Sequence, residues 1–265
     1  MLTTSAPRPV RAGQRLSPVL GFLLLAATYH AAEYTMRFHQ QVVLFLILML
    51  AVVGVAYAVA RWQGLGGLSA WGLGGGRRGA ILLGAGLLIG LAGNLLAFGL
   101  RLGLGIEVLG PWPAPAALAQ GLLLFGLGTL LPSLAEDILT RGYLWRHLSG
   151  RLQPGALVLA SAAVYVLNHV YALGSGPAQL TYLFVLGVSF AIPLVVTGNL
   201  WYAVGAHWAG NIVYRLGHDV LSVADGPNPF SGLWALTICM VLLIPVHLLV
   251  ARTLGRRLFS RQFRA

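Results

Sequence analysis

Three groups of polar residues, each with helical spacing, interrupt an otherwise apolar chain. They read Glu136-Asp137-x-x-x-Arg141, Tyr165-x-x-x-His169 and His207-x-x-x-Asn211. Residues four apart share one face of a helix, so Asp137 can pair with Arg141. The 3.6-residue repeat turns the adjacent Glu136 about 100° away from that pair. Together the groups supply one unpaired acid, two histidines and an amide, which are the groups that water activation and oxyanion stabilisation require.

The composition indicates a multi-pass membrane protein. Of the 265 residues, 58% are hydrophobic and 9% are charged, whereas soluble domains contain about 25% charged residues. An ionisable residue within a membrane-length helix costs several kcal/mol and is by default a functional-site hypothesis. The three polar groups are therefore candidates for a site inside a helix bundle.

The apolar runs predict an all-α bundle of about eight transmembrane helices, because one crossing needs about 20 predominantly apolar residues. The predicted spans are 17–35, 41–61, 79–100, 115–147, 154–173, 178–197, 199–217 and 230–252. The transmembrane domain would therefore cover residues 17–252, with its core motifs in 115–215. We expect a cytoplasmic tail at each end, residues 1–16 and 253–265.

The charges predict the orientation. The net charge is +11, and all 17 basic residues are arginines. They cluster before the first span and after the second, fourth and eighth spans, so the positive-inside rule places both termini in the cytoplasm. Arginines at span ends favour anionic lipid head groups as partners and argue against nucleic acid. Arginine without lysine, together with abundant Ala, Gly and Leu, also suggests a GC-rich prokaryotic genome, so we expect the membrane to be the plasma membrane of a prokaryote.

The three motifs resemble those of the CAAX-protease and bacteriocin-processing family of intramembrane proteases. That family carries Glu-Glu-x-x-x-Arg, Phe-x-x-x-His and His-x-x-x-Asn on successive core helices. Two positions depart from its pattern, since Asp137 replaces a glutamate and Tyr165 replaces a phenylalanine. The resemblance covers about residues 115–215 and implies a glutamate-dependent endopeptidase that cleaves a membrane protein or peptide substrate.

The chemistry of the residues assigns each a role within that class. Glu136 is suited to be the base that activates water. His169 would orient the water or relay a proton, and His207 with Asn211 would stabilise the oxyanion. Asp137, Arg141 and Tyr165 would support this arrangement. No cofactor is expected, although a zinc site of Glu136, His169 and His207 is a second interpretation.

A function without catalysis is the alternative. The same polar cavity would suit a bacteriocin-immunity protein, a scaffold or a small transporter, although a transporter usually shows an internal repeat.

Four further features have structural interpretations. The Gly-rich stretch 63–79 lacks the Lys-Ser/Thr ending of a phosphate-binding loop and is predicted to be a flexible linker. Gly86 and Gly90 form a helix-packing face. His30 and Glu33 share a face and are predicted to be a hydrogen-bonded structural pair, and Asn168 is predicted to be structural.

Overall fold

A computed structural model describes residues 16–259 of the chain. Helices α4, α5 and α6, with the π-helical turn η2, form one continuous helix Pro115–Leu148, so the described residues contain eight successive helical segments. The elements are α1 (Pro18–His39), α2 (Val42–Trp62), η1 (Leu68–Trp71), α3 (Gly76–Gly103), β1 (Glu107–Leu109), α4 (Pro115–Gly128), α5 (Leu130–Asp137), η2 (Ile138–Gly142), α6 (Tyr143–Leu148), α7 (Pro154–Asn168), η3 (Val170–Ala172), α8 (Pro177–Thr197), α9 (Trp201–Asp219), β2 (Val223–Asp225) and α10 (Gly232–Phe259).

The predicted all-α membrane bundle is confirmed. Among the described residues, five helices are long and apolar enough to cross a membrane: α2, α3, the continuous helix Pro115–Leu148, α8 and α10. Many large apolar side chains are exposed on the helix surfaces, among them Val43, Leu88 and Leu242 at 72%, 68% and 67%. Exposure of this extent is typical of a lipid-facing surface and unusual for a soluble monomer.

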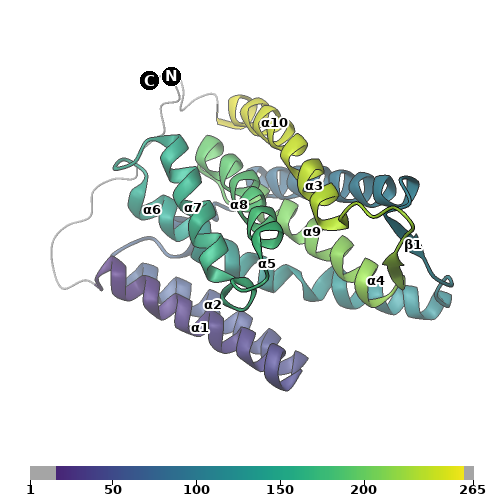
Figure 1. The fold of residues 1–265 in the computed structure, drawn as a ribbon. Helices are drawn as coiled ribbons and strands as arrows, with labels where there is room; N and C mark the ends of the chain where they lie inside the picture. Colours follow the sequence, from purple (N-terminus) through teal and green to yellow (C-terminus); the bar gives the residue numbers. More distant parts are fainter. Residues whose placement is uncertain (1–15, 260–265) are drawn as a thin grey trace.

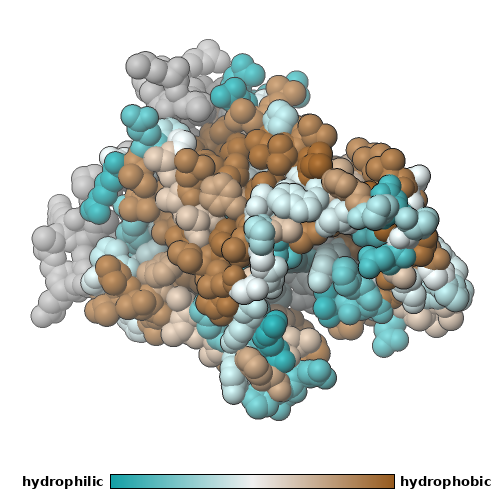
Figure 2. Space-filling view, viewed as in Figure 1, coloured by the Kyte–Doolittle hydropathy of each residue, from teal (hydrophilic) through white to brown (hydrophobic). Residues whose placement is uncertain are grey.

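The helices form a bundle in which the polar motifs lie near the middle. In Figure 1, α1 and α2 lie side by side along one edge, α3 and α10 lie at another, and α5, α7, α8 and α9 lie between them. Figure 2 shows hydrophobic side chains covering the central part of this face, over α7, α8 and α10, with hydrophilic ones towards its ends. This is the distribution expected of a protein that crosses a bilayer.

The connections divide into two sets according to the side of the bundle on which they lie. We call the side of residues 63–75, 149–153 and 198–200 the arginine-rich side, because Arg61, Arg77, Arg78, Arg146 and Arg151 lie in or next to these connections. The other side, called here the opposite side, carries residues 40–41, 104–114, 169–176 and 220–231. There the two short strands β1 and β2 pair antiparallel, a detail that the sequence did not predict.

Local sequence explains several helix boundaries. Proline occupies the first turn of α1, α4, α7 and α8, where its missing N–H costs no hydrogen bond. Gly198, with φ of 67°, ends α8 in the left-handed conformation that glycine adopts without strain. The predicted fifth span, 154–173, is too long, because α7 ends at Asn168. The helix α10 continues to Phe259, past the predicted start of the C-terminal tail, and the rest of both predicted tails lies outside the described residues.

The Gly-rich stretch is ordered, and the prediction of a flexible linker was wrong. We call residues 63–75 the Trp71 loop. Its η1 turn buries Trp71 completely, and the indole N–H donates to the carbonyl of Ala56 at 3.0 Å. The carbonyl oxygens of Gly72 and Gly74 accept hydrogen bonds from the backbone of Leu200 and the side chain of Asn199. Tertiary contacts therefore hold a segment whose composition suggests mobility.

Glycines bring α3 against α9, as the Gly86 and Gly90 spacing predicts. A methyl group on Gly86 would meet the carbonyl oxygen of Tyr202, and one on Gly90 would meet Ala206 and Ala209. Because α9 carries His207 and Asn211, this close contact helps to determine where those two side chains lie.

We predict that Gly86→Ala destabilises the protein and Gly84→Ala does not. The new methyl group of Gly86→Ala would overlap a backbone atom that cannot move aside cheaply, and overpacking of this kind costs about 1–3 kcal/mol. The position of Gly84 on the same helix has nothing within 4 Å of an added Cβ. Thermal unfolding of both variants in detergent tests this, and equal midpoints would contradict the proposed packing.

Candidate functional site

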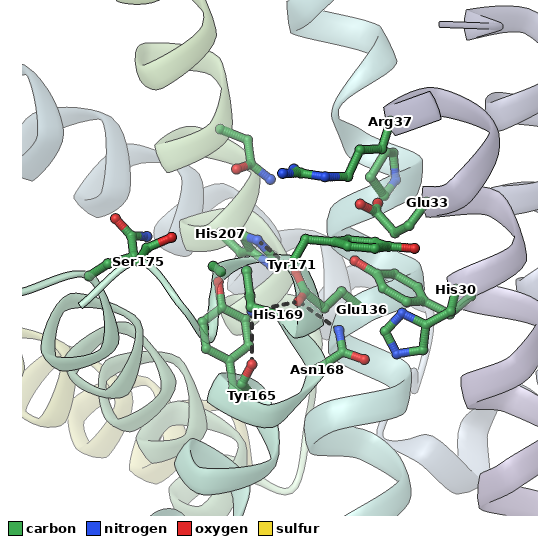
Figure 3. A pocket seen from close by; sticks show the side chains of 15 residues that line it. His30, Glu33, Arg37, Glu136, Tyr165, Asn168, His169, Tyr171, Ser175 and His207 are labelled. Carbon is green, nitrogen blue, oxygen red and sulfur yellow. Dashed lines mark hydrogen bonds and ion pairs between the residues drawn. The ribbon is translucent and has the colours of Figure 1, made fainter. Parts of the chain in front are cut away.

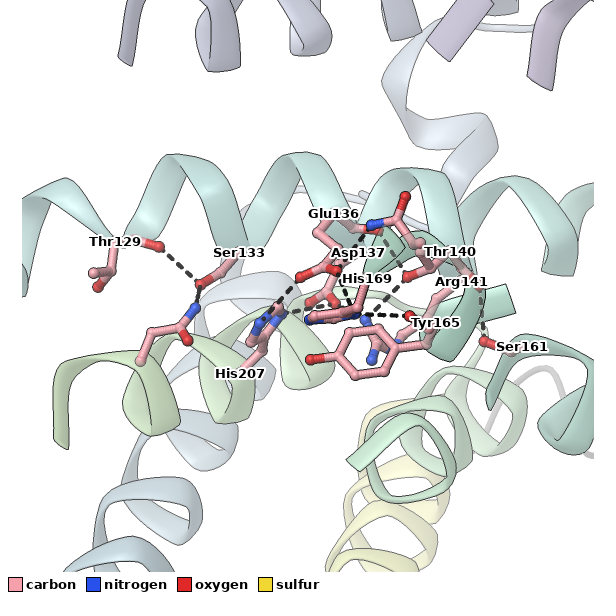
Figure 4. A network of polar contacts seen from close by, with 12 residues as sticks. Thr129, Ser133, Glu136, Asp137, Thr140, Arg141, Ser161, Tyr165, His169 and His207 are labelled. Carbon is pink, nitrogen blue, oxygen red and sulfur yellow. Dashed lines mark hydrogen bonds and ion pairs between the residues drawn. The ribbon is translucent and has the colours of Figure 1, made fainter. Parts of the chain in front are cut away.

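The three polar motifs converge inside the bundle (Figure 4). Glu136, at the end of α5, lies between the two histidines: its Oε1 is 3.6 Å from His169 Nδ1, and its Oε2 is 3.5 Å from His207 Nε2. Its side chain is only 7% exposed. Asn211 lies one turn beyond His207 on α9, and its amide donates to Ser133 Oγ at 2.9 Å. The structure therefore brings together the four residues that the sequence predicts to be catalytic.

Asp137 faces away from Glu136 and is engaged by other partners. It forms an ion pair with Arg141, four residues on, and both side chains are fully buried. It also accepts a hydrogen bond from His207 Nδ1 at 3.1 Å. The guanidinium of Arg141 lies 4.4 Å from the ring centre of Tyr165 and 5.2 Å from that of Phe190. This is the pairing that the i,i+4 spacing predicts.

The backbone changes to a π-helix immediately after these acids. Residues of η2 follow Asp137 directly, and such single-turn insertions often occur at functional sites. Thr140 Oγ1 donates to the carbonyl of Glu136 at 2.8 Å, and Ser161 Oγ donates to the carbonyl of Thr140 at 2.8 Å. The side chains of Thr140 and Ser161 therefore satisfy carbonyl groups in this part of the helix and link it to α7.

The hydrogen bonds determine which ring nitrogen of each histidine carries a proton. His169 Nδ1 lies 2.8 Å from the carbonyl oxygen of Tyr165, which can only accept, so Nδ1 is the donor. His207 Nδ1 likewise donates to the carboxylate of Asp137. In both rings Nε2 is left for other partners, and in His207 this atom faces Glu136.

Asn168 is a site residue that the sequence reasoning missed. Its amide donates to Glu136 Oε1 at 3.0 Å, the shortest contact that the structure gives to this carboxylate. The prediction of a structural role rested on an unbroken helix through residue 173. In the structure α7 ends at Asn168, and His169 has φ of −83° and ψ of 56°, outside the helical range. The sequence did contain one indication of a site residue here, namely a polar amide next to a histidine within an apolar span.

A cavity of about 440 Å³ gives access to the carboxylate of Glu136 (Figure 3). It is lined by six parts of the chain, and its residues are Tyr29, His30, Glu33, Arg37, Pro132, Glu136, Tyr165, Asn168, His169, Tyr171, Ala172, Ser175, Gln179, His207 and Asn211. Its size is within the range of pockets for small ligands or short peptide segments.

The first helix contributes one wall of this cavity. Figure 3 shows His30, Glu33 and Arg37 pointing from α1 towards the space in front of Glu136. The predicted hydrogen bond between His30 and Glu33 is not among the contacts of the described residues, where His30 Nδ1 has no partner. The pair that the sequence suggested as structural therefore belongs to the cavity.

The predicted zinc arrangement needs three ligands around one point. Within residues 16–259 no group of three His, Cys, Asp or Glu side chains is placed so that it could hold a metal ion. The nitrogen of His169 that faces Glu136 is Nδ1, 3.6 Å from Oε1. This atom carries the proton that is donated to the carbonyl of Tyr165, whereas a zinc ligand must be a deprotonated nitrogen. The side chains as they stand do not fit a zinc ion, and no step below runs through one.

These features define a class: a multi-pass helical membrane protein with a buried glutamate–histidine site that opens to a polar cavity. Residues 117–213 match the family model described as type II CAAX prenyl endopeptidase Rce1-like. Over this segment the chain is similar to the CAAX protease family, and the match supports, in general terms, an intramembrane endopeptidase of that type. No curated protein and no solved structure matches the chain. The matched segment contains all three motifs, and α1, with its cavity wall, lies outside it.

We predict that Asp137→Ala destabilises the protein far more than Asp219→Ala. Removing Asp137 leaves the guanidinium of Arg141 buried without its partner, which costs about 3–5 kcal/mol. Asp219 also pairs with an arginine four residues away, Arg215, but both side chains are more than a third exposed. Loss of an exposed pair costs at most about 1 kcal/mol.

Unfolding by denaturing detergent in mixed micelles compares the two variants. Similar losses for both would show that the buried pair contributes no more than the exposed one.

Proposed function

We propose that this protein hydrolyses a peptide bond in a membrane-associated or lipidated protein or peptide, with Glu136 as the general base. The observation that carries the proposal is the position of this carboxylate: it faces a polar cavity and lies between two histidines, while the neighbouring Asp137 is buried and paired with Arg141 and His207. The family match supports the reaction class.

The reaction begins with a water molecule in the cavity next to Glu136. Glu136 takes a proton from this water as its oxygen attacks the carbonyl carbon of the peptide bond. The carbonyl oxygen becomes an oxyanion, and the amide of Asn211 donates to it, as does His207 Nε2 when that atom carries a proton. Glu136 then gives its proton to the leaving amine, and the C–N bond breaks. His169, 3.6 Å from Glu136, orients the water.

Four residues support this chemistry by positioning the reacting groups. Asp137 holds His207 through its Nδ1 proton, and Arg141 holds Asp137. Asn168 donates to Glu136 Oε1 and so fixes the orientation of the carboxylate. Tyr165 stacks on Arg141 and accepts the Nδ1 proton of His169 on its backbone carbonyl.

The proposed mechanism uses no metal. Cleavage should therefore continue after treatment with a strong chelator. Loss of activity with EDTA and recovery with Zn²⁺ would instead favour the zinc interpretation with Glu136, His169 and His207.

We place the enzyme in the plasma membrane of a prokaryote, with both termini in the cytoplasm. The support is the distribution of arginines, since those of the arginine-rich side would meet the anionic head groups of the cytoplasmic leaflet.

We predict that Glu136→Gln lowers kcat at least about 100-fold, the usual minimum for loss of a general base. Glutamine keeps the size and can accept the bond from Asn168, so the fold should be retained. Glu107→Gln is the matched control, because Glu107 pairs with Arg101 beside β1 and does not line the cavity. Cleavage of a reporter peptide in proteoliposomes measures both. Equal cleavage by Glu136→Gln and the parent protein would rule out the mechanism and favour a non-enzymatic role.

We predict that Asn168→Ala lowers kcat by about tenfold or more, because a hydrogen bond to a charged group contributes about 1.5–3 kcal/mol. KM should change little, since Asn168 positions the base. Asn168→Asp should lose more activity, because it replaces the donor with a second negative charge next to Glu136. Asn94→Ala is the control, since the Asn94 amide bonds only to its own helix at Gly90. A change in KM alone, with kcat retained, would contradict the positioning role.

A further inference from the structure

Helix α1 adds a cation to the cavity. Among the described residues that line the cavity, Arg37 is the one arginine or lysine. It lies in the last turn of α1, outside residues 117–213, which match the family model. Arg37 takes no part in the proposed mechanism, although it lines the same space as Glu136.

Arg37 does not pair with the acid that its spacing offers. Glu33 precedes it by one helical turn, and an acid four residues before a cation is the favourable order for an ion pair on a helix. The same spacing pairs Asp137 with Arg141 in this chain. Within the part of the chain that the structure describes, no ion pair joins Arg37 to an acid. Figure 3 shows the Arg37 side chain extending away from Glu33, across the cavity.

The aromatic ring of Tyr171 holds the guanidinium of Arg37 instead. Arg37 Cζ lies 4.9 Å from the centre of this ring, which is within the range of an attractive cation–π contact. The ring of Phe38 lies against that of Tyr171 in turn, with their centres 5.6 Å apart. Contacts of α1 with η3 therefore keep the guanidinium in place, and such preorganisation lowers the cost of binding a ligand.

A guanidinium held by a ring keeps its hydrogen-bond donors available. The cation–π contact is made by the charge of the group over the ring face and requires none of the five N–H donors of arginine. These donors form a planar fork, which matches the two oxygens of a carboxylate. Arg37 therefore offers a carboxylate-binding group to a ligand in the cavity.

The acids of the cavity limit where such a ligand can lie. Glu136 lies between His169 and His207, and Glu33 lies on the wall that α1 contributes. Either acid would repel a carboxylate of the ligand, whereas Arg37 would attract it. Attraction at one place and repulsion at another are the two elements from which binding sites build specificity. Together they favour a ligand whose carboxylate lies next to Arg37.

We propose that Arg37 binds a carboxylate group of the substrate and so determines the specificity of the site. The preferred substrates are then polypeptides with a carboxylate near the cleaved bond, either an acidic side chain or a free C-terminus. This substrate preference rests on the proposed peptidase function, whereas binding of a carboxylate at Arg37 does not depend on catalysis.

Peptide binding tests the assignment without turnover. The full-length Glu136→Gln protein in lipid nanodiscs is titrated with versions of a fluorescent membrane peptide. One version has a free C-terminus and no acidic side chain. Others have an amidated C-terminus and a single glutamate at each position in turn, and the reference version has neither carboxylate.

We expect a carboxylate version to bind about tenfold more tightly than the reference, because a hydrogen bond to a charged group changes an affinity by about that factor or more. Adding Arg37→Gln should remove the difference. Arg37 is exposed, so the fold should be retained.

Two comparisons separate a specific role of Arg37 from a general effect of charge. Arg61→Gln is the matched control and should keep the preference, because Arg61 is also an exposed arginine in the last turn of a helix but does not line the cavity. Tyr171→Phe should keep the preference and Tyr171→Leu should weaken it, because a ring face holds the guanidinium.

The outcomes identify the source of the carboxylate and separate binding from catalysis. Tighter binding of the free C-terminus alone would identify a terminal carboxylate, and tighter binding of a glutamate version alone would identify an acidic side chain. A preference that Arg37→Gln leaves unchanged, no preference, or no binding by any version would overturn the proposal. A protein that shows the preference but cleaves nothing would refute the peptidase function and leave the role of Arg37 in place, and cleavage without the preference would do the reverse.

Discussion

The buried ion pair between Asp137 and Arg141 is the constraint on which the site depends. Two adjacent carboxylates in a membrane-embedded bundle would repel each other and would be costly to desolvate. Arg141, one helical turn after Asp137, neutralises that carboxylate. The carboxylate of Glu136 then faces away from the ion pair. The division of roles between two neighbouring acids therefore follows from helix geometry and one cation.

The same cation organises the helices around it. Arg141 lies against the rings of Tyr165 on α7 and Phe190 on α8, and Asp137 binds His207 on α9. A phenylalanine at residue 165 would offer the same ring face. Tyr165, which stands where the family pattern has phenylalanine, is therefore compatible with the contact to Arg141. The departure from glutamate to Asp137 also leaves the contacts to Arg141 and His207 in place, although the side chain is one methylene shorter.

The sequence predicts those parts of the site that depend on regular helices. The eight helical segments follow from the apolar runs, and the structure contains them, although α7 ends five residues before the predicted end of the fifth span. The pairing of Asp137 with Arg141 and the shared face of His207 and Asn211 follow from helical periodicity, and the structure contains both. The contact of Asn168 with Glu136 could not be predicted, because the orientation of Asn168 depends on the end of α7 at this residue. The sequence prediction assumed a helix that continues to residue 173. The contribution of α1 to the cavity could not be predicted either. Spacing shows that His30 and Glu33 share one face of a helix, but it does not show which other helix that face contacts. The order of the Trp71 loop was missed for a similar reason. Glycine content indicates the conformational freedom of the backbone, but it does not show the tertiary contacts that restrict this freedom.

The two sides of the site have opposite physical requirements, and the fold separates them along one helix. Asp137 and Arg141 need exclusion of water, because their attraction is strong only at low dielectric. Hydrolysis needs the reverse, since one water is consumed in every cleavage. Tyr143 and the Trp71 loop pack over the helix beyond Arg141, whereas the cavity lies next to Glu136 at the end of α7. A site open at both ends would expose the ion pair, and one closed at both ends would lack its reactant. The site therefore needs one buried acid next to an accessible one, and Asp137 and Glu136 are placed in this way.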